Sequence, residues 1–405
     1  MLKVRRMRIL YLVYYYFPRV SAATWSTFAI TRRLAKKNDV TLLAPNISFN
    51  LTLNGNTVAK YEAQNPATVV RTPRLRIPLK LASFLSPFFL LLRGIELGRG
   101  ADIVVCQFQP NHFTFLTGLM TGKILRLPVV ARANDIYREM DVPGMGPIYS
   151  LNEARKRMYN ALSEAFIGYA DAFFVVCEEN RDVLESRRGR LNNVGLSYNG
   201  VDLEEIRVPE KSQSRKRLGI DPDAKIILFI GRSSGPEYRI EALIEAFTLI
   251  KKFESEAILI LVGDEPPSSL RGNPYLTSGS IRVKGATSRE EIKLYLSAAD
   301  VCVGPLGRTR AIPLKVLEYM AAGRPVVTGV DSVSKEVAVD GFNCICVKPD
   351  AEHVAEGILK ALRDDEYRNK IVENAKKTAT KFSWDSIVGG LEDTLRQVYA
   401  KKWSA

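Results

Sequence analysis

Short apolar segments rich in β-branched residues alternate with longer amphipathic segments along the whole chain. The apolar segments are hydrophobic at nearly every position, as expected of parallel strands that helices cover on both faces. In the first half of the chain the predicted strands are 7–14, 40–44, 69–70, 103–106, 129–131 and 172–176. Predicted helices include 22–36, after the first strand, and 153–169, before the last. This alternation predicts a doubly wound α/β domain.

The alternation breaks near 208–211 and then starts again. The second series of predicted strands comprises 225–231, 257–263, 281–283, 301–303 and 325–327. Predicted helices lie at 240–253, 288–298, 351–362, 365–382 and 384–401. The sequence therefore predicts two Rossmann-like, doubly wound parallel-sheet domains, 1–207 and 208–383, which face each other across a cleft.

Length and charge fit this division. The chain has 405 residues, and single cores tend to split above about 250–300 residues. A formal net charge of +14 and a pI near 9.5 favour an anionic partner, which could be nucleic acid, anionic lipid or a phosphorylated small molecule. The chain has only two histidines, so a structural zinc site is not expected.

The first residues resemble a secretory signal peptide as well as a first strand. Basic residues precede the apolar run 9–13, and 21–23 could serve as a cleavage site. Three tyrosines at 14–16 and Pro18 interrupt the apolar run, so we expect a strand of the first domain. No segment reaches the roughly 18 apolar residues of a membrane-spanning helix.

The segment 313–327 is the most informative part of the chain. Pro313 predicts the start of a helix, Gly323 its left-handed end, and a strand follows at once. A helix start offers backbone N–H groups and a positive dipole end, which bind phosphate. Glu318 lies one turn further in, where its carboxylate can accept hydrogen bonds from a ribose diol. An ordinary helix–strand unit with a solvated glutamate explains the same residues.

Other polar residues follow the predicted strands of the second domain. Arg232 comes directly after strand 225–231, and ligands of open α/β sheets bind at such strand ends. Its planar guanidinium suits a diphosphate, although a solvated or ion-paired arginine is the alternative. Gly263 ends the next strand, and Lys315 lies just before Glu318 at the phosphate-binding end of the predicted helix.

The order of these features resembles the retaining glycosyltransferases of the GT-B fold, specifically family 4. The resemblance covers nearly the whole chain and depends on several short motifs in the family's order. They are Phe17-Pro18, Asn199-Gly200-Val201-Asp202, Phe229-Ile230-Gly231-Arg232, Leu261-Val262-Gly263-Asp264, Ala298-Ala299-Asp300-Val301, the segment 318–327 and Phe382-Ser383-Trp384.

The resemblance implies transfer of a sugar from a nucleotide-diphosphate donor to an acceptor, with retention of the anomeric configuration. The second domain would hold the donor, with Arg232 on the diphosphate and Glu318 on the ribose. The helix start at Pro313, Leu314, Lys315 and Val316 would present backbone N–H groups to the phosphates. The first domain would hold the acceptor, and a last helix at 384–402 would pack back on it. No metal or other cofactor is expected, because arginine, lysine and a helix start would neutralise the leaving diphosphate.

Four positions depart from the family pattern. Arg310 stands where the first of two paired glutamates usually lies, which suits a donor sugar bearing a carboxylate or an extra phosphate contact. Arg239 is the nearest substitute for a lysine that usually follows Arg232. Ala22-Ala23 replaces a glycine pair in the first loop, and Asn134-Asp135 replaces a histidine after strand 129–131.

Three places are candidates for the catalytic and acceptor side. Asp135, with Asn134 beside it, could accept a hydrogen bond from the incoming hydroxyl, although a turn-forming Asn-Asp pair explains them equally well. Ala22 and Ala23 belong to the first loop. His112 follows a strand and could line the cleft, with a structural histidine as the alternative.

The segment 71–92 combines basic and apolar residues. Residues 71–80 are basic and free of acids, and 81–92 are almost wholly apolar. This combination suits an anchor on an anionic membrane surface, and a core helix with a basic lead-in is the alternative. Nucleic acid is not expected, because the basic residues lack interleaved aromatics or a known fold signature. We expect a cytoplasmic protein and leave open its peripheral attachment to the inner face of the cell membrane.

These observations predict a retaining glycosyltransferase that moves a sugar from a nucleotide-diphosphate sugar to a glycan or lipid-linked acceptor. Two alternatives remain. Arg310 and Asn134 suggest a catalytically inactive nucleotide-sugar-binding module. A nucleotide-sugar epimerase would need acid–base residues, which a chain with two histidines scarcely offers.

Overall fold

The computed structural model describes most of the chain. Not described are residues 1–4, 20, 47–54, 75–78, 110–111, 137–146, 232–237, 264–269, 286, 308, 310–311, 331–332, 334 and 404–405, nor the side chains of helical residues 79–84, 147–153 and 155. Two predicted site residues, Arg232 and Arg310, therefore lie outside the described residues.

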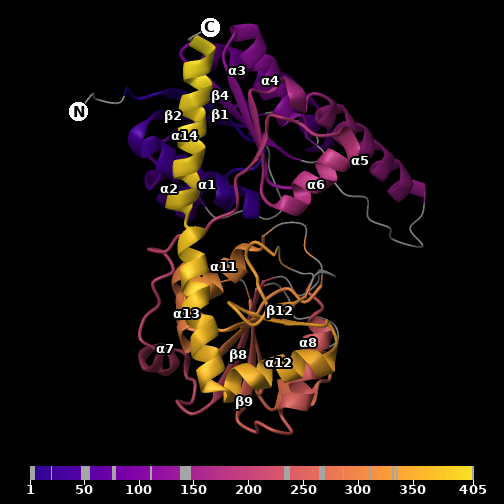
Figure 1. Ribbon diagram of the computed structural model, residues 1–405, viewed down its shortest axis with the longest axis vertical. Coiled ribbons are helices and arrows are strands. Elements are labelled where there is room, and N and C mark those ends of the chain that lie inside the picture. Colours follow the sequence, from indigo (N-terminus) through magenta and orange to yellow (C-terminus); the bar gives the residue numbers. More distant parts are fainter. Residues whose placement is uncertain are drawn as a thin grey trace. The chain divides into compact units, whose positions relative to one another are not determined.

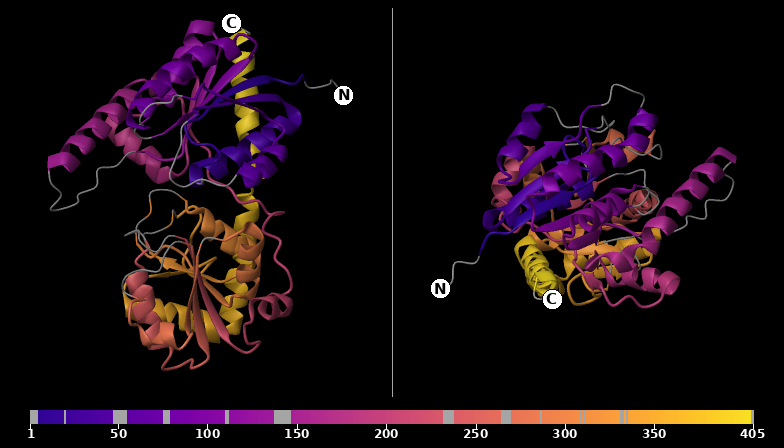
Figure 2. Two further views of the ribbon diagram at one scale, coloured as in Figure 1. Left: turned by 180° about the vertical axis from the view of Figure 1, so that it is seen from behind. Right: turned by 90° about the horizontal axis from the view of Figure 1, so that it is seen from above.

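The chain divides into two compact units (Figure 1). Unit 1 consists of Met1–Tyr198 and Trp384–Ala405, and unit 2 of Asn199–Ser383. The chain enters and leaves unit 2 at adjacent points, since Val201 N–H donates to Phe382 O at 2.9 Å. Each unit contains one parallel sheet with helices on both faces (Figure 2), so the predicted fold class is confirmed.

The sheet of unit 1 has seven strands in the order β3-β2-β1-β4-β5-β6-β7. Their bounds are β1 (Arg8–Leu12), β2 (Asp39–Ala44), β3 (Thr68–Arg71), β4 (Ile103–Phe108), β5 (Val129–Ala133), β6 (Ala172–Val175) and β7 (Val194–Leu196). The strand order reverses direction between β1 and β4, and in such sheets ligands bind at the carboxyl ends of the strands near this point.

The helices of unit 1 come from both of its chain segments. They are α1 (Ala22–Lys37), α2 (Gly55–Ala63), α3 (Leu79–Gly98), α4 (Thr114–Leu125), α5 (Pro147–Ala165), α6 (Glu178–Arg188) and α14 (Trp384–Trp403), with a 3₁₀ turn η1 at Ile167–Tyr169. The last helix, α14, packs against α1. The buried Arg33 donates to Asp385 at 3.0 and 3.1 Å, and Asn38 Nδ2 donates to Glu392 Oε1 at 3.2 Å.

Unit 2 has a six-stranded sheet in the order β10-β9-β8-β11-β12-β13. Its strands are β8 (Lys225–Gly231), β9 (Ala257–Gly263), β10 (Ile281–Lys284), β11 (Val301–Val303), β12 (Val326–Gly329) and β13 (Ile345–Val347). Its helices are α7 (Lys211–Leu218), α8 (Ile240–Ile250), α9 (Pro274–Thr277), α10 (Arg289–Ala298), α11 (Leu314–Ala321), α12 (Ala351–Arg363) and α13 (Asp365–Lys381).

Three aspartates fix the register at the amino ends of neighbouring strands. Asp102, Asp171 and Asp300 each lie just before a strand. Each donates its N–H to a carbonyl on the adjacent strand, at 2.7, 2.8 and 2.9 Å respectively. Each also accepts, through its carboxylate, the N–H of that same adjacent residue, at 2.8, 2.8 and 2.6 Å. The partners are Arg8, Val129 and Ile226.

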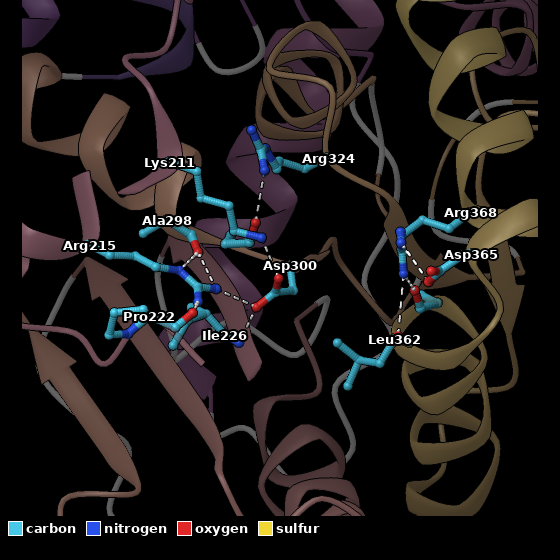
Figure 3. Close-up of polar contacts among 12 residues, drawn as sticks. Lys211, Arg215, Pro222, Ile226, Ala298, Asp300, Arg324, Leu362, Asp365 and Arg368 are labelled. Carbon is cyan, nitrogen blue, oxygen red and sulfur yellow. Dashed lines mark hydrogen bonds and ion pairs between the residues drawn. The ribbon is translucent and has the colours of Figure 1, made fainter. Parts of the chain in front are cut away.

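Asp300 belongs to the predicted Ala298–Val301 motif, and its surroundings are structural (Figure 3). Its carboxylate accepts hydrogen bonds from Arg215 Nη2 at 2.7 Å and from Lys211 Nζ at 2.5 Å. This cluster lies at the amino ends of β8 and β11, opposite the carboxyl ends that carry the predicted donor site.

Candidate functional site

Helix α11 starts at the carboxyl side of the unit 2 sheet. It begins at Leu314, and Pro313 is its N-cap residue rather than its first helical residue as predicted. The first turn of a helix leaves backbone N–H groups without partners inside the helix, and here Val316 N–H donates to Pro313 O at 3.1 Å. Gly323, with φ +68°, follows the C-cap Ala322 in the predicted left-handed conformation.

A tyrosine fixes α11 to the end of β8. The Tyr319 side chain is fully buried, and its hydroxyl accepts the N–H of Ile230 at 2.9 Å. Burial raises the pKa of Tyr319 well above its ordinary value, so the hydroxyl stays neutral. Helix α11 is thereby fixed beside the last residues of β8.

Two glycines end β8 and β9 and allow close approaches. Gly231 and Gly263 have φ values of +143° and +152°, which favour glycine. A Cβ atom at Gly231 would lie 2.0 Å from Lys315 Nζ, and one at Gly263 would lie 2.0 Å from Gly231 O. Lys315 therefore lies over the end of β8, which is where the sequence predicted a phosphate site.

Aromatic rings also hold the Lys315 side chain. Its Nζ is 4.7 Å from the ring centroid of Phe229 and 4.1 Å from that of Tyr238. Cation–π contacts of this kind stabilise an ammonium group without neutralising its charge. Lys315 thus brings a positive charge to the carboxyl end of β8.

Glu318 belongs to an ion-pair chain that the sequence analysis missed. Arg289, the first residue of α10, contacts Glu318 Oε1 through Nη1 at 2.8 Å. Arg289 Nε also donates to Glu205 Oε1 at 3.0 Å. Burial opposes the charge on Arg289, but the two glutamates outweigh it and raise its pKa above the ordinary value. No local pattern marks Arg289 or Glu205, because the chain contributes them from distant segments.

Arg239 lies at the start of α8 (Ile240–Ile250). It is the N-cap of α8, with φ +48°, and its side chain is exposed. Its role as a substitute donor ligand stays a prediction.

In unit 1, Asn134 lies just after β5 and contacts a buried arginine. Arg132 Nη1 donates to Asn134 Oδ1 at 2.7 Å. The Asn134 Nδ2 atom is buried and has no hydrogen-bond partner in the part of the chain that the structure describes. The amide therefore presents a donor at the carboxyl end of β5. An arginine within the apolar run of β5 was the sequence signal for this network, and it was missed.

The other residues predicted for unit 1 also follow strand ends. Asp135 Oδ1 accepts the N–H of Ile136 at 2.9 Å, as in a local turn. Ala22 and Ala23 are the first two residues of α1. His112 stacks on Tyr14 with centroids 3.6 Å apart.

His112 is also hydrogen-bonded to an aromatic residue after β1. Its Nε2 and the Tyr15 hydroxyl share a hydrogen bond of 2.8 Å. The loops after β1 and β4 are thus joined, as expected of neighbouring strands. Roles in acceptor binding for His112, Ala22 and Ala23 stay predictions.

The described residues contain neither a metal-binding cluster nor a membrane-spanning helix. Among them, no group of three or more His, Cys, Asp or Glu side chains is placed to hold a metal ion. Within the same ranges, every helix is too short or too polar to cross a membrane.

Two family models match the chain, one over most of each unit. "Glycosyltransferase Family 4" matches residues 23–205, and "Glycosyl transferases group 1" matches residues 210–378. The uncharacterized glycosyltransferase MJ1607 of Methanocaldococcus jannaschii is 31% identical over 345 residues, which cover 82% of this chain and 85% of that protein. A D-inositol 3-phosphate glycosyltransferase of Nocardioides sp. is 25% identical over 52% of this chain and 50% of its own length.

Solved structures share the fold. Anabaena Alr3699/HepE in complex with UDP-glucose has a TM-score of 0.70 at 17% identity, with 97% of this chain and 100% of that chain covered. WaaG, a glycosyltransferase involved in lipopolysaccharide biosynthesis, has a TM-score of 0.68 at 16% identity, with 95% and 99% covered. Both sequence and fold therefore lead to one conclusion: this chain belongs to the family 4 glycosyltransferases of the GT-B fold.

Proposed function

We propose that this glycosyltransferase takes its sugar from a nucleotide-diphosphate donor bound to unit 2 and transfers it with retention of the anomeric configuration. The observation that carries the proposal is the arrangement at the carboxyl end of β8. There the Lys315 side chain, from the start of α11, lies against Gly231, and Glu318 lies one turn along the same helix. A helix start and an ammonium group suit a diphosphate, and a carboxylate suits a ribose diol.

The chain's residues would act mainly by binding and charge stabilisation. The backbone of Leu314 and Lys315 and the Lys315 ammonium group would stabilise the negative charge that develops on the leaving diphosphate. The acceptor hydroxyl would form the new bond to the anomeric carbon as the bond to the phosphate oxygen breaks. Its proton would pass to that leaving oxygen, so no protein nucleophile and no metal are required.

The solved relatives support uridine nucleotides as the first donors to test. The Anabaena structure contains UDP-glucose, and others of the same protein contain UDP. Arg310 remains our candidate for contact with the donor sugar, and Arg232 for contact with the diphosphate.

Thermal unfolding in the presence of nucleotides tests the donor site. A ligand at 100 times its Kd stabilises the folded state by about 2.7 kcal/mol, which corresponds to several degrees in Tm. We expect UDP or UDP-glucose to raise the Tm of the wild type, and Glu318→Ala to lose most of this increase. Glu356→Ala, an exposed glutamate on α12, is the matched control and should behave as the wild type.

The reaction products distinguish the proposed activity from its alternatives. Transfer or hydrolysis of the donor releases the nucleotide diphosphate. Donor binding with no product would identify an inactive binding module, and an isomerised donor sugar would identify an epimerase. A product with inverted anomeric configuration would contradict the retaining mechanism.

We further propose that the acceptor side meets an anionic membrane surface through α3 and α4 of unit 1. These helices pack side by side, and each exposes large apolar side chains. The exposed residues are Phe88 and Leu92 on α3 and Met120 and Ile124 on α4. Exposed basic residues follow at the ends of the two helices, namely Arg99, Lys123 and Arg126. Apolar residues next to bases suit an anionic interface.

Vesicle sedimentation tests this surface. We expect the wild type to bind phosphatidylcholine vesicles that contain phosphatidylglycerol and to bind pure phosphatidylcholine weakly. The double variant Phe88→Asp/Ile124→Asp should lose this binding. Phe253→Asp, which changes an exposed phenylalanine of unit 2, should retain it. Equal binding by both variants would exclude α3 and α4 as the contact surface.

A further inference from the structure

Three charged residues from distant segments meet beside the proposed ribose site. Glu205 follows the Asn199–Asp202 segment, Arg289 begins α10, and Glu318 lies in α11. Arg289 lies between the two glutamates, with Nε 3.0 Å from Glu205 Oε1 and Nη1 2.8 Å from Glu318 Oε1. The side chains of Arg289 and Glu318 are only 25% and 16% exposed, so solvent screens their interaction weakly.

The geometry fixes the direction of the Glu318 carboxylate. A guanidinium group is planar, and its N–H groups point in fixed directions. With Glu205 holding Nε, Arg289 can present Nη1 to Glu318 in one orientation. This ion pair engages Oε1 of Glu318, and among the described residues no hydrogen bond or ion pair engages Oε2.

The charge balance leaves Glu318 able to accept hydrogen bonds. Two carboxylates share one guanidinium, so the three residues together carry one net negative charge. A carboxylate with one oxygen held can still accept hydrogen bonds at the other oxygen and at a remaining lone pair. Two adjacent hydroxyl groups are the donors that such a group fits.

We propose that Arg289 is a positioning residue for the donor: held by Glu205, it orients Glu318 so that the carboxylate accepts both hydroxyl groups of a ribose. This inference rests on the proposed function, since it assumes that unit 2 binds a nucleotide. Its consequence is selectivity for ribonucleotides over 2′-deoxyribonucleotides. Arg289 would act on the ligand only through Glu318.

Paired nucleotides provide the test. Calorimetric titration would give Kd values for UDP, GDP and ADP and for their 2′-deoxy forms, and the tightest pair is used for all variants. A hydrogen bond to a charged group is worth about a 10- to 100-fold change in affinity. We expect the wild type to prefer the ribonucleotide by a factor in this range. Glu318→Gln and Arg289→Met should each reduce the preference to less than about 3-fold.

The change should be larger for the ribonucleotide. Arg289→Met should weaken its binding more than that of the 2′-deoxy form, which has only the 3′-hydroxyl to donate to Glu318. Arg289→Lys should keep part of the preference, because an ammonium group can pair with a carboxylate but cannot hold both glutamates in fixed directions. Arg271→Met, an exposed arginine of the same unit, should change neither affinity.

Each outcome separates the positioning role from the proposed function. If the wild type binds none of the nucleotides, the proposed function fails and the positioning role fails with it. If the wild type binds and Arg289→Met keeps its preference, only the positioning role fails. An equal loss for both forms would show that Arg289 contacts the nucleotide directly, which also overturns it. Should Arg289→Met not fold, Glu205→Gln and Arg289→Lys give the same comparison.

Discussion

At the scale of single residues, Arg132 shows how a buried charged side chain can orient a neighbouring amide for ligand binding. Its side chain is 1% exposed and donates to neutral oxygen atoms of its surroundings. The acceptors are Ser26 Oγ at 3.3 Å, Ser197 Oγ at 3.3 Å, Ser197 O at 3.0 Å, Tyr198 O at 3.0 Å and Asn134 Oδ1 at 2.7 Å. Because the Asn134 oxygen is engaged, its NH₂ group is the part that remains for a ligand.

Replacing Arg132 tests this network. Burial lowers the pKa of Arg132 to about 10, so the side chain is still charged at pH 7. Arg132→Met would leave several buried acceptors without donors, each costing about 1–3 kcal/mol. We expect unit 1 to lose about 3 kcal/mol or more in urea unfolding, and Arg132→Lys to lose less. The exposed control Arg190→Met should stay within about 0.5 kcal/mol of wild type. A loss below about 1 kcal/mol in Arg132→Met would contradict the argument.

At the scale of the elements, the amino and carboxyl ends of the strands have different roles. Aspartates fix the amino ends by pairing with both the N–H and the C=O of one neighbouring residue. Glycines at the carboxyl ends of β8 and β9 let the backbone and Lys315 approach closely. Register is therefore set at the amino ends of the strands, and their carboxyl ends are left for binding.

The contribution of Asp102 to the stability of unit 1 should depend on pH. Burial opposes its ionisation, but hydrogen bonds from the Arg8 side chain and backbone outweigh this and hold its pKa below the ordinary 3.8. The unfolded chain then binds the proton more tightly, so this contribution to stability is present above about pH 4 and is lost as the pH falls through the lowered pKa. We expect Asp102→Asn to cost about 1–2 kcal/mol near pH 7. The difference from wild type should shrink below pH ~4 in denaturant titrations.

The two strand-end glycines should respond differently to alanine. At Gly263 the new Cβ would meet the backbone of Gly231, which cannot move without disturbing the sheet. We expect Gly263→Ala to destabilise unit 2 by about 2 kcal/mol or more, from strain and overpacking. At Gly231 the Cβ would meet the flexible end of Lys315. Gly231→Ala should therefore cost less stability but weaken nucleotide-diphosphate binding. Equal effects on stability and binding in the two variants would contradict this distinction.

The elements also show what the sequence could predict. The strands Lys225–Gly231, Ala257–Gly263 and Val301–Val303 have the predicted bounds, because the buried residues of each strand form a continuous apolar run. The helix α7 was missed because it is highly polar and forms where the domain break was predicted. Tertiary contacts hold it, among them the hydrogen bonds from Arg215 to Ala298 O and Asp300.

The candidate site likewise contains residues that the sequence could predict and one that it could not. Lys315 and Glu318 could be found from the sequence, because one helix start with its following turn contains both. Arg289 could not, because its contact with Glu318 joins two helices whose separation in space no periodicity encodes. Charged residues that act through distant partners are therefore the part of a site that the structure must supply.

At the scale of the whole molecule, unit 2 is inserted into unit 1. The chain leaves unit 1 after Tyr198 and returns to it at Trp384. Helix α14 thus belongs to the fold of the first 198 residues, and its buried Leu391 and Leu395 contribute to that unit. A change near the C-terminus should therefore act on the unit that contains the N-terminus.

Calorimetry of two matched variants tests this consequence. Leu395 on α14 and Ile358 on α12 are both fully buried, so truncation to alanine should cost about 2–5 kcal/mol at either site. Leu395→Ala should lower the unfolding transition of unit 1, and Ile358→Ala that of unit 2. We propose that UDP binds unit 2. UDP should therefore raise the unfolding temperature of unit 2, which identifies its transition. We expect the UDP-sensitive transition to fall in Ile358→Ala and to stay unchanged in Leu395→Ala. A fall of the UDP-sensitive transition in Leu395→Ala would mean that α14 stabilises the donor unit instead.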